Sequence, residues 1–298
     1  MLAAMPVTAA ELRVRARRLR DAFEPIAGAV YFLPECRERY VALGLADFGP
    51  AYFASRGGCI GGGKGPVSGE MVVAAFGVFS PAMVIPAVEH AWSVTDAATL
   101  LLARERGTVE GLTRILGADP HGLTRATELL RAGADAATGE GRALFSGLRS
   151  LGWPGDPVGD LWRAADLVRE HRGDSHIAAW ISHGLGPVEA QILLELWWRR
   201  PVGPYTRTRG WTDEQIASTW TGLQEKGYVA GEPANGSFTA EGEALRASIE
   251  DATDRQELSI IEAIGEHADE LLDLLRPWAL EIIAAKAYPS DPASYTRP

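Results

Sequence analysis

The sequence lacks the features that mark several common classes of protein. Its 298 residues include two cysteines, Cys36 and Cys59, which are too few for a disulfide framework or a cysteine-based zinc site. The amino-terminal segment has no apolar run long enough for a signal peptide. The longest uncharged apolar stretch, 71–88, is interrupted by Ser80, Pro81 and Pro86, so we expect no membrane span. These absences predict a cytoplasmic protein.

A surplus of basic residues is also missing. The net charge is −10 and the pI is about 5.2, whereas non-specific affinity for nucleic acid comes mainly from Lys and Arg that neutralise phosphates. This composition excludes a broadly basic surface but leaves room for a local basic patch. The hydrophobic content of 46% suffices for a packed core, and the length suits two domains or one large one.

Helical periodicity and capping residues predict a mainly α protein. A glycine-rich segment, 56–66, nearly matches a P-loop, but Gly65 stands where Ser or Thr would bind magnesium. We interpret this segment as a flexible loop or wing-like tip. Turn residues at 152–157 predict a boundary between an N-terminal half, 1–152, which carries this loop, and a C-terminal half, 153–288. We expect a flexible tail over 289–298.

The C-terminal half has the element order of a winged helix. We expect helices over 160–170, 176–182 and 188–198, with Gly173 breaking the first from the second. A capped helix then begins at 212, a hairpin with an Asn-Gly turn covers 228–239, and a long helical region extends to 286. The predicted fold is therefore two winged-helix-like or helix-turn-helix halves, with a small β-hairpin wing and a long C-terminal helical region.

Two resemblances support this fold. The segments 222–229 (GLQEKGYV) and 238–245 (FTAEGEAL) are similar to the end of the recognition helix and the wing of MarR-type regulators. The segments 167–179, 209–214 and 79–84 resemble an actinobacterial family of paired helix-turn-helix proteins, over nearly the whole chain. A faint repeat of 72–83 in 176–190 indicates that the N-terminal half is also winged-helix-like. The junction of two such halves is a natural place for a pocket.

The densest group of polar residues, 162–183, is the predicted site. His171, Asp174 and His176 are candidates for general acid or base, because a histidine beside a carboxylate titrates near neutral pH. Arg172 would hold an anionic or carbonyl group of the substrate. Ser175 is a further candidate for substrate binding, and it could act as a nucleophile only if a histidine reaches it. Trp162 and Trp180 would wall an apolar or aromatic pocket.

A structural role for the same residues is the alternative. Arg172 and Asp174 would then pair to lock a turn, and the histidines would satisfy backbone carbonyls. His171, Asp174 and His176 have no recognised metal-ligand spacing, and we predict neither a metal nor a cofactor.

Charge decides between the two functions that this fold favours. Residues 187–247 contain six Lys or Arg and eight Asp or Glu, a net charge of −2. Asp213, Glu214 and Glu225 lie in the helix that would enter a DNA groove, and they would face phosphates. We therefore predict a small-molecule-binding protein on a winged-helix scaffold, with an aromatic or anionic ligand.

This prediction includes a cofactor-independent acid/base enzyme of specialised metabolism. The alternative function is a ligand-responsive, MarR-like transcription regulator, with DNA disfavoured as a partner by the charge. A non-catalytic interaction partner is the third interpretation, and a homodimer is compatible with each of the three.

Overall fold

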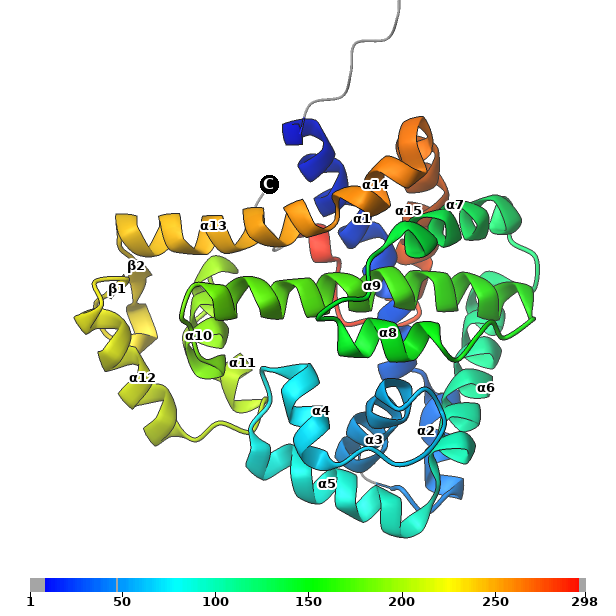
Figure 1. The fold of residues 1–298 in the computed structure, drawn as a ribbon, viewed down its shortest axis with the longest axis horizontal. Coiled ribbons are helices and arrows are strands. Elements are labelled where there is room, and N and C mark those ends of the chain that lie inside the picture. The colour runs from blue at the N-terminus through cyan, green and yellow to red at the C-terminus, as the bar shows by residue number, and fades with distance from the viewer. Residues whose placement is uncertain (1–8, 47, 295–298) are drawn as a thin grey trace, which may run out of the picture.

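The computed structural model describes residues 9–46 and 48–294 as a mainly helical protein (Figure 1). Proline at the first helical position and side-chain caps such as Ser68 and Asp96, which each accept a backbone N–H three residues on, set where several helices begin. The first part of the chain forms α1 (Ala9–Gly28), α2 (Pro34–Ala42), α3 (Phe48–Ile60), α4 (Gly69–Phe76), α5 (Pro81–Val94), α6 (Ala97–Leu116), α7 (Leu123–Ala136) and α8 (Ala143–Arg149).

One long helix, α9 (Pro157–Ser182), crosses the middle of the molecule (Figure 1). Asp156 caps it, because its carboxylate accepts the N–H groups of Val158 and Gly159. The predicted break at Gly173 was wrong, since α9 is one continuous helix of 26 residues that includes this glycine. Packing of α9 against α1, α6, α7, α8 and α13 outweighs the cost of about 1 kcal/mol that a glycine imposes within a helix.

The glycine-rich segment is also more ordered than expected. Residues 56–60 form the last turn of α3, and only the residues after Ile60 form a turn. A Cβ added at Gly57 would lie 3.0 Å from a methyl of Val72, and one at Gly58 would lie 3.2 Å from Leu101. The glycines therefore allow close helix packing, and the predicted loop or wing-like tip at 56–60 was wrong.

The C-terminal half contains the predicted winged helix. Its elements are α10 (Pro187–Trp197), α11 (Pro204–Arg207), α12 (Asp213–Glu225), the two-stranded antiparallel sheet of β1 (Val229–Ala230) and β2 (Ser237–Phe238), and α13 (Ala240–Gln256). Val229 pairs with Phe238 and Ala230 with Ser237. The Asn-Gly turn was wrong in detail: a 3-10 turn, Pro233–Asn235, fills the loop, and Gly236 has a negative φ.

Two large hydrophobic cores, together with two smaller clusters among α3, α4, α5 and α6, hold these elements together. The larger core combines α1, α7, α8 and the first part of α9 with α14 (Leu258–Ile264) and α15 (Ala268–Ala284). The second core joins the end of α9 to α10, α12, β1 and α13. The chain thus returns to its N-terminal part after the winged helix, and α9 contributes to both cores.

The segment after α15 packs on the body as far as it is described. Asp291 forms an ion pair with Arg276, and Pro292 is buried. The last four residues of the predicted tail lie outside the described residues. Among the helices described, none combines the length and apolar character needed to cross a membrane.

Candidate functional site

The predicted site residues all lie on α9, but they face different neighbours. Successive residues of a helix point about 100° apart, so His171, Arg172, Asp174 and Ser175 cannot converge on one point. The structure places Arg172 and His176 against α13, and Asp174 and Ser175 against α8 and the loop before it. Within the described residues, no three His, Cys, Asp or Glu side chains are grouped to hold a metal ion.

His171 is part of a closed structural pair. Its ring is fully buried, with Nδ1 2.8 Å from Oε1 of Glu257, and it packs edge-on against Phe145 at 5.1 Å between ring centroids. Glu257 stands where α13 meets α14. This pair ties α9 to the end of α13 and leaves His171 without access to solvent.

Asp174 and Ser175 hold α8 in place. Asp174 accepts the backbone N–H of Phe145 at 3.0 Å, and burial raises its pKa to about 7. The Ser175 hydroxyl accepts a hydrogen bond from Nε of Arg142 at 3.0 Å. Asp174 does not pair with Arg172, so the locked turn considered above is not formed.

Arg172 and His176 belong to an ionic cluster on α13. Arg172 lies 2.8 Å from Oδ1 of Asp254 and 3.5 Å from Oε2 of Glu250, while His176 Nδ1 lies 3.0 Å from the hydroxyl of Thr253. Burial lowers the pKa of His176 to about 4, so its ring is neutral at neutral pH. The partners of both histidines are side chains and not the backbone carbonyls of the structural alternative.

The two tryptophans do not wall a common pocket. Trp162 is fully buried and donates its indole N–H to the carbonyl of Ala27 at 3.3 Å. Trp180 packs against Gly77, and its indole nitrogen has no partner within the described chain. Eighteen residues of helix separate their α-carbons by about 27 Å.

A buried ionic ladder on α9 was missed by the sequence analysis. Asp166 lies between Arg104, at 2.7 Å, and Arg56, at 3.4 Å. One turn later, Oε1 of Glu170 accepts a hydrogen bond from Arg56 at 2.7 Å and also forms an ion pair with Arg169. Burial alone would raise the pKa of Asp166, but Arg104 and Arg56 lower it to about 2. The signal in the sequence was the recurrence of charged residues at 163, 166, 169, 170 and 172 within an otherwise apolar helix.

Gly173 marks the one point where this part of α9 opens to solvent, since residues 170–172 and 174–175 are buried and Gly173 is exposed. The four residues one turn away, on the same side, contact three other helices and the residue that follows a fourth. Arg169 binds Glu24 of α1 and His176 binds Thr253 of α13. Glu170 binds Arg56 of α3, and Ile177 packs against Gly77 after α4. We call this opening, with its bordering side chains, the Gly173 window.

Tyr52 of α3 connects the window to the winged helix. Tyr52 is half-buried, and its hydroxyl makes no hydrogen bond within the described chain. Burial raises the pKa of this hydroxyl to about 12, although the positive charges of Arg169 and Arg209 lower it. Electrostatic interaction with Glu170 and Tyr205 also raises this pKa. The ring stacks on the exposed Phe48 at 5.1 Å and contacts Phe76 and Phe79.

The two halves of the chain are joined beside Tyr52. The N–H of Ser80 donates to the carbonyl of Arg209 at 2.8 Å, and the indole N–H of Trp211 donates to the carbonyl of Val78 at 2.9 Å. The guanidinium of Arg209 lies over the rings of Phe79, at 4.8 Å, and Tyr205, at 4.1 Å. Arg209 therefore lies beside the aromatic group around Tyr52, on the winged-helix side, because Phe79 contacts both Arg209 and Tyr52.

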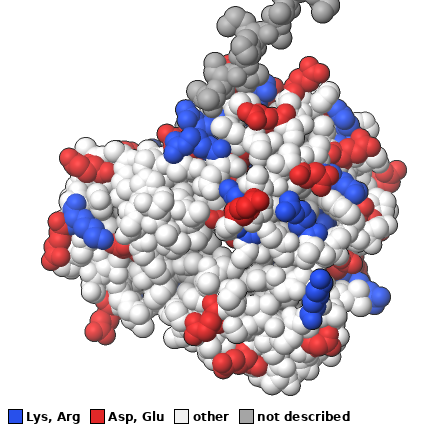
Figure 2. All heavy atoms as spheres, viewed as in Figure 1, with Lys and Arg blue, Asp and Glu red and all other residues white. Residues whose placement is uncertain are grey.

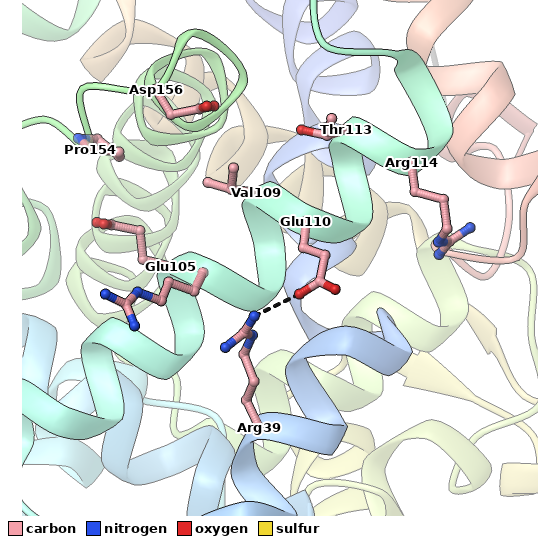
Figure 3. A pocket seen from close by; sticks show the side chains of 9 residues that line it. Arg39, Glu105, Val109, Glu110, Thr113, Arg114, Pro154 and Asp156 are labelled. Carbon is pink, nitrogen blue, oxygen red and sulfur yellow. Dashed lines mark hydrogen bonds and ion pairs between the residues drawn. The ribbon is translucent and has the colours of Figure 1, made fainter.

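A surface hollow of about 630 Å³ lies elsewhere, between α2, α6 and the loop before α9 (Figure 3). Most of its charged residues are already paired: Arg39 binds Glu110 at 2.7 Å, Arg114 binds Glu35, and Glu105 binds Arg163 at 3.2 Å. None of the predicted site residues lines it. We therefore prefer the Gly173 window as the candidate site.

The face that a winged helix would present to DNA is acidic. On α12, Asp213, Glu214 and Glu225 are exposed, and Glu232 is exposed in the wing. Lys226, at the end of α12, is paired with Glu189 at 2.6 Å. Figure 2 shows mainly acidic side chains among the charged groups over this part of the molecule. Such a surface would repel phosphates.

Comparison with known proteins places the fold in a family. The sequence model of a helix-turn-helix family matches residues 16–289, and the chain belongs to that family. Searches of curated proteins and of solved structures found no match. The matched residues include both large cores and all of α9.

Proposed function

We propose that this protein binds a small molecule at the Gly173 window and uses its winged helix as a scaffold. The observation that carries the proposal is the exposure of Gly173 between buried, charged residues of α9. A ligand bound there would meet side chains from α1, α3, α9 and α13. Sites of this kind, at the junction of two units and with a few polar groups among aromatic walls, are typical of small-molecule binding.

The hydrogen-bonding groups at the window are available as well as close together. Both contacts of Glu170 use Oε1, which leaves Oε2 free of hydrogen bonds within the described chain. The Tyr52 hydroxyl is free in the same sense. A ligand could therefore satisfy these groups without breaking the ladder of ion pairs beneath them. The exposed aromatic ring of Phe48 and the rings behind it would provide apolar contact.

Binding is better supported than acid/base catalysis. His171 is closed off by Glu257 and Phe145, and Asp174 faces α8 on another side of the helix from His176. A general acid and base must both reach the reacting group, and these three side chains share no such point. We therefore propose binding without assigning a reaction.

Ligand-responsive DNA binding is the second candidate, because the chain belongs to a helix-turn-helix family. The acidic surface of α12 and the wing argues against it. Titration of fragmented genomic DNA across a salt series separates the two, since phosphate contacts give a steep loss of affinity with salt. We expect no binding at low salt, and tight, salt-sensitive binding would make the protein a regulator.

A matched pair of variants tests the window. We would screen a fragment library by ligand-observed NMR against the wild type, Gly173→Phe and Gly173→Ala. A Cβ at residue 173 would meet only Oε2 of Glu170, at 3.6 Å, so alanine fits and phenylalanine must extend into the opening. We expect fragments that bind the wild type and Gly173→Ala and lose most of their affinity for Gly173→Phe. A screen whose hits bind all three proteins equally would place the ligand elsewhere.

A further inference from the structure

We infer that the ligand of the Gly173 window is an aromatic carboxylic acid whose carboxylate binds Arg209. This inference rests on the proposed function and specifies the ligand class for that same window. It starts from the partners of Arg209. Ion pairs with carboxylates are formed by several arginines on α9 and on the helices around it: Arg17, Arg20, Arg56, Arg104, Arg169, Arg172 and Arg246. Arg209 forms none with any carboxylate in the described residues.

The surroundings of Arg209 hold its guanidinium ready for an anion. Its Nη2 donates to the hydroxyl of Tyr205, its Nη1 donates to Thr208 at 3.2 Å, and the rings of Phe79 and Tyr205 lie against it. Contact with aromatic rings fixes the orientation of a guanidinium while leaving its charge uncompensated. A carboxylate is the planar anion that fits the paired N–H groups of arginine.

The hydroxyls of Tyr52 and Tyr205 suit the same anion. Both lie close to Arg209: the Tyr205 ring is against its guanidinium at 4.1 Å, and the Tyr52 ring contacts Phe79, which is also against it. A phenol O–H can donate to a carboxylate oxygen. The carboxylate of Glu170 would repel an anion, but Arg56 and Arg169 already offset its charge. The ligand's acid group is thus directed towards Arg209 and away from α9.

The body of the ligand would lie on aromatic side chains. Tyr52 contacts Phe76 at 5.5 Å and Phe79 at 5.8 Å, and Phe48 stacks on its outer side. Edge-to-face and stacked rings of this kind accept a further ring favourably. Arg209 would repel a cationic polyamine and would form no ion pair with a neutral sugar. The chemistry of the window therefore selects a flat apolar acid.

Paired probes measure the role of the carboxylate directly. A panel of aryl carboxylic acids, such as 2-naphthoate, would be compared with the matching primary amides, such as 2-naphthamide, by NMR titration. We expect each acid that binds the wild type to bind at least about tenfold tighter than its amide, a difference that charge-assisted hydrogen bonds to arginine can supply. The Arg209→Gln variant should lose this preference and leave amide binding unchanged.

Control variants separate the inference from the proposal beneath it. Arg207→Gln removes a guanidinium two residues away, on an exposed side chain paired with Asp213, and should bind both members of each pair as the wild type does. Acids and amides that bind equally well, and that Gly173→Phe excludes, would overturn the carboxylate inference and leave the window as the site. If Gly173→Phe prevents the binding of no acid or amide in the panel, the inference fails. The broader fragment screen then tests the proposed function separately.

Discussion

Removal of the Asp166 carboxylate tests whether the buried ladder on α9 holds the protein together. In the Asp166→Asn variant Arg104 loses its ion pair, while Arg56 keeps Glu170 at 2.7 Å. The guanidinium of Arg104 is almost fully buried over the ring of Trp162, at 4.6 Å. A buried charge left without its partner costs about 3–5 kcal/mol. We expect a loss of that size in the free energy of unfolding.

Urea unfolding followed by tryptophan fluorescence and circular dichroism would measure the loss. The urea concentration at the denaturation midpoint should fall. The slope of the free energy of unfolding against urea concentration should stay constant, because the surface exposed on unfolding is unchanged. Asp269→Asn is the control: it removes an exposed carboxylate that pairs with Arg18 at 3.2 Å, and such a pair contributes less than about 1 kcal/mol. Equal effects of the two variants would refute the reasoning.

A double variant separates the lost charge pair from lost packing. Asp166→Leu combined with Arg104→Met replaces the pair with apolar side chains, and such replacements are often neutral or stabilising. We expect the double variant to be more stable than Asp166→Asn, although it has lost more hydrogen bonds. A double variant less stable than the single one would show that the ion pair itself favours folding.

The remaining predictions concern pH and the opening at Gly173. The raised pKa of Asp174 means that the folded state holds its proton more tightly, so Asp174→Asn should gain stability relative to the wild type as pH rises from about 4 to about 7. The lowered pKa of His176 has the opposite sign: His176→Gln should gain relative stability as pH falls from about 6.5 to about 4. Denaturation curves at pH 4.5, 6 and 7.5 would check both, and parallel pH profiles for variant and wild type would contradict either. Gly173→Ala should raise the free energy of unfolding by about 0.5–1 kcal/mol, seen as a higher melting temperature, and a decrease would show that the position requires glycine.

The sequence predicted the winged helix because its signals are local. Thr212 caps α12 with Gln215, Thr239 caps α13, and each needs only neighbouring residues. The mainly helical class follows from the same kind of pattern. In contrast, the continuity of α9 through Gly173 depends on helices far away in the sequence. Local preference predicted a break there, and tertiary packing overrode it.

The candidate site was only partly predictable for a similar reason. The sequence analysis indicated the helix that carries the candidate site, since polar residues gather at 162–183, but helical geometry distributes them among several partners. Tyr52, Arg209 and Glu250 reach this region from α3, the loop after α11, and α13. Their proximity to α9 is a result of the fold, and no spacing in the sequence indicates it.

The ion pairs of α9 also determine its rotation about its own axis. Charged and apolar residues occur on nearly every side of this helix, so a single apolar stripe cannot orient it. A shift by one residue would turn every side chain by about 100° and would separate Asp166, Glu170 and Arg172 from their partners together. Because α9 enters both cores, the rotation fixed by Arg56 and Arg104 in the first core also sets the direction in which α12 and the wing project from the second.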